Sequence, residues 1–345
     1  MDKSLLLKLL DTVSVSGNER SVSRIFATCA TQCAMRVDKD AMGNTYAHTG
    51  SDETPQAKVL IEAHCDEIGF QVINVADSGY VYVRRNGGID EQCLPGSQMV
   101  IQTRTGELLP AVIGKKPIHL MSTDDRKRTF EIHQLWLDTG MDAEQVKAKV
   151  SVGDYVAARP NAQFMGDNRI TSKALDNKLG VFILTQVMRR LADAPHPNGV
   201  CLAATVQEEV GSRGAVVCAH RVKPGIAITV DVDFATDVPD CNPTRYGSIR
   251  LGDGVIIPRN VDCDMALSDE LEKIAKEMQI PHQVSARPHA TGGTNTSRIQ
   301  IAQDGVRTIS LGIPCRYMHT PTEVCDLRDV EACIQLIISY LQTTQ

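Results

Sequence analysis

The sequence has few aromatic residues, no Cys-x-x-Cys pair and no long hydrophobic run. Aromatic residues make up 4% of the 345 residues, but 42% are hydrophobic, so the composition is that of a globular protein with a sizeable core. No segment reaches the roughly 20 apolar residues that a membrane span needs. The eleven cysteines are odd in number and scattered, which is typical of reduced thiols in a cytosolic protein.

An excess of positive charge is also missing. The formal net charge is −6, and the basic cluster at 126–128 is short and follows two aspartates. We therefore expect no nucleic-acid partner. The N-terminal run at 4–10 is interrupted by Lys8 and is not followed by a cleavage site of small residues, so we predict no signal peptide. The expectation is a cytoplasmic protein with no membrane partner.

The predicted elements alternate between strand and helix at both ends of the chain but not in its middle. Helical spacing at 4–11 precedes a Ser16-to-Glu19 capping box that predicts a second helix. Residues 70–156 instead contain short β-like pieces separated by Gly, Asp and Pro turns. The pattern predicts an α/β fold with a mixed sheet sandwiched by helices, formed by 1–67 and 164–345, and a small β-rich domain inserted at 68–163.

Histidine and acidic residues follow three of the predicted strands. His64 follows the apolar run 59–63, Glu208 and Glu209 follow 201–207, and Asp231 follows 226–230. Ligands of open α/β sheets bind beyond the carboxyl ends of the strands, so these side chains are expected to meet. Each residue alone also has an ordinary explanation, such as a loop histidine or a solvated strand end. Two free carboxylates after an apolar strand are nevertheless costly unless they are paired or bind a cation.

Two further residues are candidates for the same site. Asp176 is predicted to open a helix, where a carboxylate is favoured even as a plain cap, and His319 lies in the loop after the last predicted strand. Two histidines with several carboxylates and no cysteine suit zinc, cobalt or manganese, and the excess of oxygen ligands suggests two ions bridged by one carboxylate. Asp66 shares a face with His64 and could hold its imidazole N–H.

The two adjacent glutamates are predicted to have different roles. Neighbouring residues on an extended segment point to opposite sides, so one of Glu208 and Glu209 is expected to hold a metal and the other to move a proton. Their adjacency also argues against a glycosidase, because neighbouring carboxylates cannot flank a sugar bond at the separation that this chemistry requires.

Four motifs, in the same order along the chain, resemble one known family. They are Ala-His-Cys-Asp-Glu-Ile-Gly-Phe at 63–70, Ala-Leu-Asp-Asn-Lys-Leu-Gly at 174–180, Thr-Val-Gln-Glu-Glu-Val-Gly-Ser-Arg-Gly-Ala at 205–215 and Asp-Val-Asp-Phe-Ala-Thr-Asp-Val-Pro at 231–239. The family is that of the tetrahedral (TET)-type dinuclear metallo-aminopeptidases of peptidase clan MH. It includes glutamyl and deblocking aminopeptidases, and some members are labelled cellulases or endoglucanases.

The resemblance implies a zinc-peptidase-like catalytic domain with a PDZ-like insert, and it assigns roles to the candidate residues. One metal ion would be held by His64, Asp176 and Asp231, and a second by Asp176, Glu209 and His319. Glu208 would be the general base that takes a proton from the attacking water, and Asp66 would orient His64. Zinc is the first expectation for both ions, with cobalt or manganese as alternatives. Homo-oligomers, including a tetrahedral dodecamer, are also implied.

The resulting prediction is an enzyme, a metal-dependent aminopeptidase that hydrolyses N-terminal residues from peptide substrates. The alternatives are a related amide hydrolase, either a carboxypeptidase or an N-acyl-amino-acid deacylase, or a non-catalytic member that keeps the fold for assembly or binding. The loop at 291–296 resembles a Gly-Gly-Thr-Asp loop of the family, with Asn295 in place of the usual Asp. Its alternative interpretation is a plain glycine turn before a helix.

Overall fold

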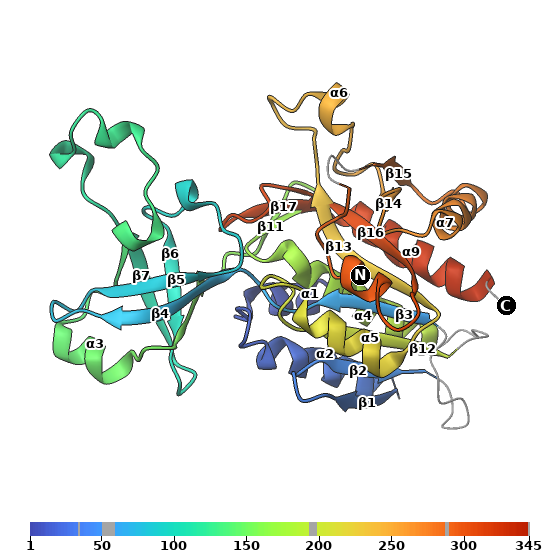
Figure 1. Cartoon of the computed structure of the whole chain (residues 1–345), viewed down its shortest axis with the longest axis horizontal. Helices are drawn as coiled ribbons and strands as arrows, with labels where there is room; N and C mark the ends of the chain where they lie inside the picture. Colours follow the sequence, from blue (N-terminus) through green and yellow to red (C-terminus); the bar gives the residue numbers. More distant parts are fainter. Residues whose placement is uncertain (34, 50–58, 193–198, 287–289, 344–345) are drawn as a thin grey trace.

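In the computed structural model, which describes residues 1–33, 35–49, 59–192, 199–286 and 290–343, the chain forms two parts (Figure 1). The larger part is built on an eleven-stranded mixed sheet covered by helices, and the smaller is a closed barrel of six strands. The predicted fold class, a helix-covered mixed sheet with a small β-rich insert, is confirmed.

The large sheet has a parallel centre and antiparallel edges. Four neighbouring strands, β12, β3, β13 and β16, run parallel, and the strands on either side of them in the main path pair antiparallel. In spatial order the strands are β1 (Arg36–Lys39), β2 (Thr45–His48), β12 (Val200–Thr205), β3 (Val59–His64), β13 (Ile226–Phe234), β16 (Arg307–Arg316), β17 (Glu323–Asp326), β11 (Arg169–Ser172) and β10 (Gln163–Met165). A side branch, β14 (Val255–Pro258) with β15 (His282–Ser285), joins at β16.

Helices cover both faces of this sheet. The larger core contains buried residues of α1 (Lys3–Asp11), α2 (Arg20–Gln32), α4 (Leu175–Ala192), α7 (Met265–Glu277) and α9 (Leu327–Thr343). A second core contains residues of α5 (Arg213–Val222) and α8 (Thr296–Gln300). The short helix α6 (Pro243–Tyr246) has no buried residue. Almost every side chain of α4 is buried, so this helix lies at the centre of the large part.

The alternation of side chains along the central strands decides which residues face the site. In β3, Ile61 packs in the larger core and Leu60 packs in the α5/α8 core, so Glu62 and His64 belong to the α5/α8 side. The register pairs Thr229 of β13 with Glu62. Two residues further along both parallel strands, Asp231 therefore comes beside His64.

The small barrel lies to one side of the sheet (Figure 1). Its strands are β4 (Gly69–Val75), β5 (Val81–Asn86), β6 (Gln98–Gln102), β7 (Leu108–Gly114), β8 (Trp136–Asp138) and β9 (Tyr155–Ala158). They enclose a separate apolar core, to which α3 (Ala143–Lys149) contributes Val146. All six strands lie within 68–163, although the domain boundaries at these residues stay a prediction. A turn after β5 reaches the large part, where the Asp90 N–H donates to the His319 carbonyl at 3.1 Å.

The predicted capping box at the start of α2 is wrong. Glu19 is the N-cap of this helix and makes no side-chain cap bond; its carboxylate instead accepts the Gly17 N–H at 2.6 Å. The Ser16 hydroxyl donates to Asp66 at 2.6 Å, so the serine is used for the site and not for the helix. As for membrane crossing, the helices in the described ranges are all too short or too polar for it.

Candidate metal centre

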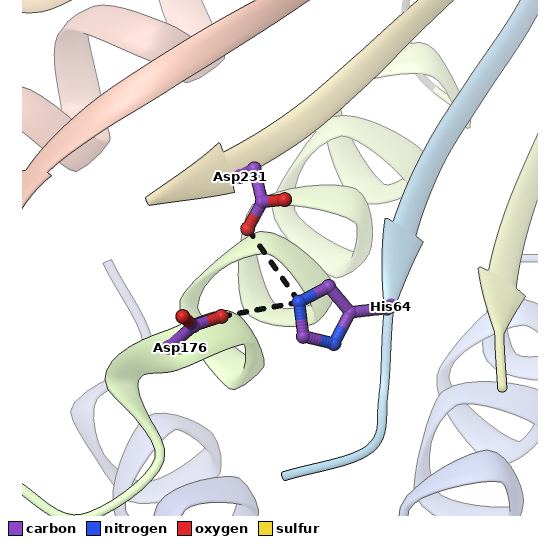
Figure 2. A group of neighbouring side chains, drawn as sticks. All are labelled: His64, Asp176 and Asp231. Atoms are coloured by element: carbon purple, nitrogen blue, oxygen red, sulfur yellow. Dashed lines mark ion pairs between the residues drawn. The ribbon is translucent and has the colours of Figure 1, made fainter. Parts of the chain in front are cut away.

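Two groups of potential metal ligands share one carboxylate. Atoms of His64, Asp176 and Asp231 lie within 4.8 Å of one another, and so do atoms of Asp176, Glu209 and His319. Figure 2 shows the first group: His64 Nε2 lies 3.1 Å from Asp176 Oδ1 and 3.5 Å from Asp231 Oδ1. In the second group, His319 Nε2 lies 3.4 Å from Asp176 Oδ2 and 3.6 Å from Glu209 Oε2. The two oxygens of Asp176 thus face two different histidines, as a bridging carboxylate requires.

The local backbone explains how Asp176 can serve both groups. Although it lies within the bounds of α4, Asp176 has φ −76° and ψ 108°, and Asn177 is also non-helical, so the regular helix begins only after them. The Asn177 side chain fixes this start, because it donates to the Val230 carbonyl of β13 at 2.7 Å and accepts the Gly180 N–H at 3.0 Å. Asp176 is therefore held at the carboxyl end of the sheet.

The prediction that Glu208 and Glu209 point to opposite sides was wrong. The strand β12 ends at Thr205, and Gln207 takes a positive φ of 59°, which turns the chain before Glu208. Both carboxylates consequently line the same cavity of about 540 Å³, together with His64, Asp176, Asp231 and His319. Atoms of both glutamates lie within 4.8 Å of one another and of a His64 ring nitrogen, so strand alternation does not divide their roles.

Asp231 also lies differently from its predicted place after a strand. The strand β13 continues to Phe234, so Asp231 is a residue of the strand itself, and it is almost fully buried. The strand is longer than predicted because β16, its parallel neighbour, also continues past the apolar run and pairs with it as far as Cys315.

Asp66 organises the first histidine and both glutamates. Its Oδ1 lies 3.4 Å from His64 Nδ1, on the side of the ring away from Asp176, which agrees with the predicted contact. Its oxygens also accept the backbone N–H groups of Glu208 at 3.0 Å and Glu209 at 3.2 Å. The same ring nitrogen lies 3.2 Å from the backbone carbonyl of Asp66, so Asp66 contacts His64 through both its main chain and its carboxylate. The carboxylate also holds the turn that carries both glutamates. Its role in orienting His64 stays a prediction.

The electrostatics of the cavity call for positive charge. Burial opposes the charged form of His64, yet the charge of Asp231 and hydrogen bonds with the neighbouring carboxylates raise the pKa of His64 well above its usual value. Burial raises the pKa of Glu208 to about 8; His64 opposes this shift and the nearby aspartates add to it. Burial and the charge of Asp176 raise the pKa of Glu209 well above the ordinary range. Crowded buried carboxylates of this kind are stabilised by a cation.

The residues present fit divalent cations. Imidazole nitrogens and carboxylate oxygens are the ligands that zinc, cobalt and manganese accept. Within the part of the chain that the structure describes, Glu209 Oε1 is buried and has no hydrogen-bond partner, which leaves this oxygen available for an ion.

A buried cluster of charged side chains lies beside the site, and the sequence did not predict it. Glu67 Oε2 lies 2.6 Å from Lys173 Nζ and Glu67 Oε1 lies 2.9 Å from Lys178 Nζ, and all three side chains are at most 2% exposed. The cluster joins the turn that follows His64 to the two ends of the segment that carries Asp176. The only sequence signal was the pair of lysines that flank Asp176.

Replacing Glu67 with Gln is expected to lower the free energy of unfolding by about 3–5 kcal/mol, because it leaves the buried Lys173 and Lys178 amines without their carboxylate. Urea unfolding measures the change. Glu107→Gln is the matched control: its pair with Lys149 is about half exposed, at 3.0 Å, and its loss should cost less than about 1 kcal/mol. Equal stability of the two variants would contradict a structural role for the cluster.

The loop at 291–296 lines the cavity only in part. Thr291, Gly292, Gly293 and Thr294 lie along it, whereas Asn295 is fully buried and is absent from its wall. The Asn295 side-chain amide donates to Glu62 at 2.5 Å and to Thr205 at 3.1 Å. Asn295 therefore ties the loop to β3 and β12, and the loop is more than a plain turn before α8.

Known proteins are similar to this chain along most of its length. A family model described as M42 glutamyl aminopeptidase matches residues 43–336. The lysyl aminopeptidase of Pyrococcus furiosus is 29% identical, over 99% of this chain and 97% of its own. A TET aminopeptidase from the marine sediment archaeon Thaumarchaeota archaeon SCGC AB-539-E09 has a structure with TM-score 0.93 at 30% identity, covering 99% and 96% of the two chains. The TET1 peptidase of Pyrococcus horikoshii, which can assemble into a tetrahedron or a large octahedral shell, gives 0.88 at 27% identity, covering 99% of both chains.

Proposed function

This chain belongs to the M42 glutamyl aminopeptidase family of hydrolases, and we propose that it removes N-terminal residues from peptides at a centre of two divalent metal ions. One ion would be held by His64, Asp176 and Asp231, and the other by Asp176, Glu209 and His319. The observation that carries the proposal is the shared carboxylate, whose two oxygens face one histidine in each group. Zinc is the proposed ion, with cobalt or manganese as alternatives.

The chemistry of the site follows from its ligands and from the remaining glutamate. Ions bound there would lower the pKa of a water molecule toward about 7 and polarise the scissile carbonyl. Glu208 lines the same cavity, and the ligand group that contains it, with His64 and Glu209, does not include the shared Asp176. We therefore assign Glu208 as the general base that accepts the proton and passes it to the leaving amine. Asp66 holds His64 and the backbone of Glu208 in place.

The carboxylates of the cavity also favour a substrate with a free amino terminus. A peptide amine carries positive charge and hydrogen-bond donors, and acetylation removes the charge and most of the donors. We therefore expect aminoacyl anilides with a free amine to be hydrolysed with kcat/KM at least about 100-fold higher than their N-acetylated counterparts. The measurement compares matched pairs of anilides across several side chains, with chelator-treated enzyme as the blank. Release of acetate from the acetylated member, with its anilide bond left intact, would favour a deacylase and contradict the aminopeptidase.

A homo-oligomer in the cytoplasm is the proposed form of the protein. The assembly of Pyrococcus horikoshii TET1 peptidase into closed shells supports an oligomer, and eleven free cysteines are consistent with a reducing compartment. Sedimentation velocity of the purified protein tests the first point. A species with the mass of twelve chains is expected for a tetrahedral particle, and a stable monomer would contradict it.

A further inference from the structure

Glu323 lies between the backbones of two predicted metal ligands. It is the first residue of β17 and is 1% exposed. Its Oε2 accepts the N–H of Asp176 at 3.1 Å, and its Oε1 accepts the N–H of His319, also at 3.1 Å. One buried carboxylate thus connects the start of α4 with the loop that joins β16 to β17.

Both of these N–H groups belong to backbone that regular secondary structure does not fix. Asp176 precedes the regular part of α4, and the first N–H groups of a helix have no partner within the helix. His319 has a positive φ of 63°, a conformation that is costly for a residue other than glycine unless its surroundings determine it. The Glu323 carboxylate satisfies both donors and so stabilises both conformations.

The remaining ligands are held by other means. Asp231 is part of β13, and Asp66 holds the His64 ring and the Glu209 N–H. The Asn177 side chain and the Asp90 N–H also hold the backbone around Asp176 and His319, but Glu323 hydrogen-bonds to the N–H groups of both residues and so links this pair, which defines the second ion site together with Glu209.

We propose that Glu323 is a positioning residue for the second metal ion, because it sets the spacing between the bridging Asp176 and His319. The inference rests on the proposed two-ion centre. It assigns to Glu323 no contact with substrate and no proton transfer. A ligand pair that is misplaced should bind its ion more weakly, while the ion between His64 and Asp231 should be affected less.

Glu323→Gln tests the role, because the amide is isosteric with the carboxylate but turns one acceptor into an N–H₂ group facing a backbone N–H. Titration of the metal-free protein with zinc, followed by calorimetry, is expected to show two ions per chain in the wild type. In the variant, one of the two affinities should fall about 10–100-fold. Activity at low free zinc should fall with it and recover when zinc is in excess. Glu323→Asp keeps both oxygens and should recover part of the lost affinity.

Asp329→Asn is the matched control. Asp329 is also a buried carboxylate that accepts two backbone N–H groups, from Gly252 at 2.8 Å and Gly254 at 2.7 Å, but it does not line the cavity. Both metal-free variants are expected to lose thermal stability, and only E323Q should lose zinc affinity. If E323Q does not fold, the same titration of E323D decides, with a smaller loss expected.

Two results would overturn the inference. In the first, the folded Glu323 variants bind both ions as tightly as the wild type. In the second, D329N weakens zinc binding as much as E323Q. A wild-type protein that fails to bind two ions would instead contradict the proposed function itself, so the two failures can be told apart.

Discussion

Replacing Glu208 with Gln is expected to lower kcat by about 10²–10⁴-fold, while the protein continues to bind two ions per chain. Glutamine has the same shape but cannot accept a proton. The Glu208 N–H would still be held by Asp66, and the Ser212 hydroxyl, 3.4 Å from Glu208 Oε1, could still donate to the amide oxygen. KM should change little, because the residue acts on the transition state and not on substrate binding.

Asp329→Asn is a suitable control for this experiment. Asp329 is another buried carboxylate, which accepts the N–H groups of Gly252 and Gly254, but it is not part of the cavity wall. Its replacement should leave kcat within a few-fold of the wild type. Steady-state kinetics with metal analysis of the same samples provide the readout. An E208Q enzyme that retains more than about a tenth of kcat would contradict the assignment of Glu208 as the general base.

Removal of the metal ions is expected to abolish activity and to lower the melting temperature by several degrees. Without cations, the carboxylates of Asp176, Glu208, Glu209 and Asp231 remain crowded in one cavity with two histidines to compensate them. An ion that binds only the folded state contributes about 2.7 kcal/mol at a concentration 100 times its Kd. Chelation, calorimetry and stepwise return of zinc, cobalt or manganese measure both effects.

The E208Q variant is the control for metal removal, since it keeps every proposed ligand. It should show the same fall in melting temperature as the wild type and no return of activity. Chelated wild-type protein that keeps its activity would contradict a metal-dependent mechanism. Unchanged thermal stability after complete metal loss would contradict the idea that the ions compensate the buried carboxylates.

Much of the site could be predicted because strands order its residues. His64 and Asp231 follow apolar runs that form neighbouring parallel strands, and the register between β3 and β13 brings them together. The mixed sheet and the β-rich insert could also be predicted, because the sequence changes from alternating strand and helix patterns to short β-like pieces separated by turns. The division of labour between Glu208 and Glu209 and the pairing of Asp176 with His319 came from the resemblance to the family.

The rest could not be predicted, because it depends on backbone conformations and contacts that strand and helix periods do not encode. The positive φ at Gln207 puts both glutamates into one cavity, contrary to the alternation of an extended strand. Glu323 lies 147 residues from Asp176 in sequence, and Glu67 lies 106 residues from Lys173, so neither contact leaves a local pattern. Ser16 fits the local Ser-x-x-Glu pattern of a helix cap. Its hydrogen bond to Asp66 spans 50 residues, so no local pattern could reveal it.

The two-ion centre is tested most directly by anomalous diffraction from crystals of the zinc-bound protein. Two peaks are expected at the zinc edge in each chain, one among His64, Asp176 and Asp231 and the other among Asp176, Glu209 and His319. Asp176 should lie between them. A single peak in this cavity, or peaks that do not share Asp176, would contradict the account.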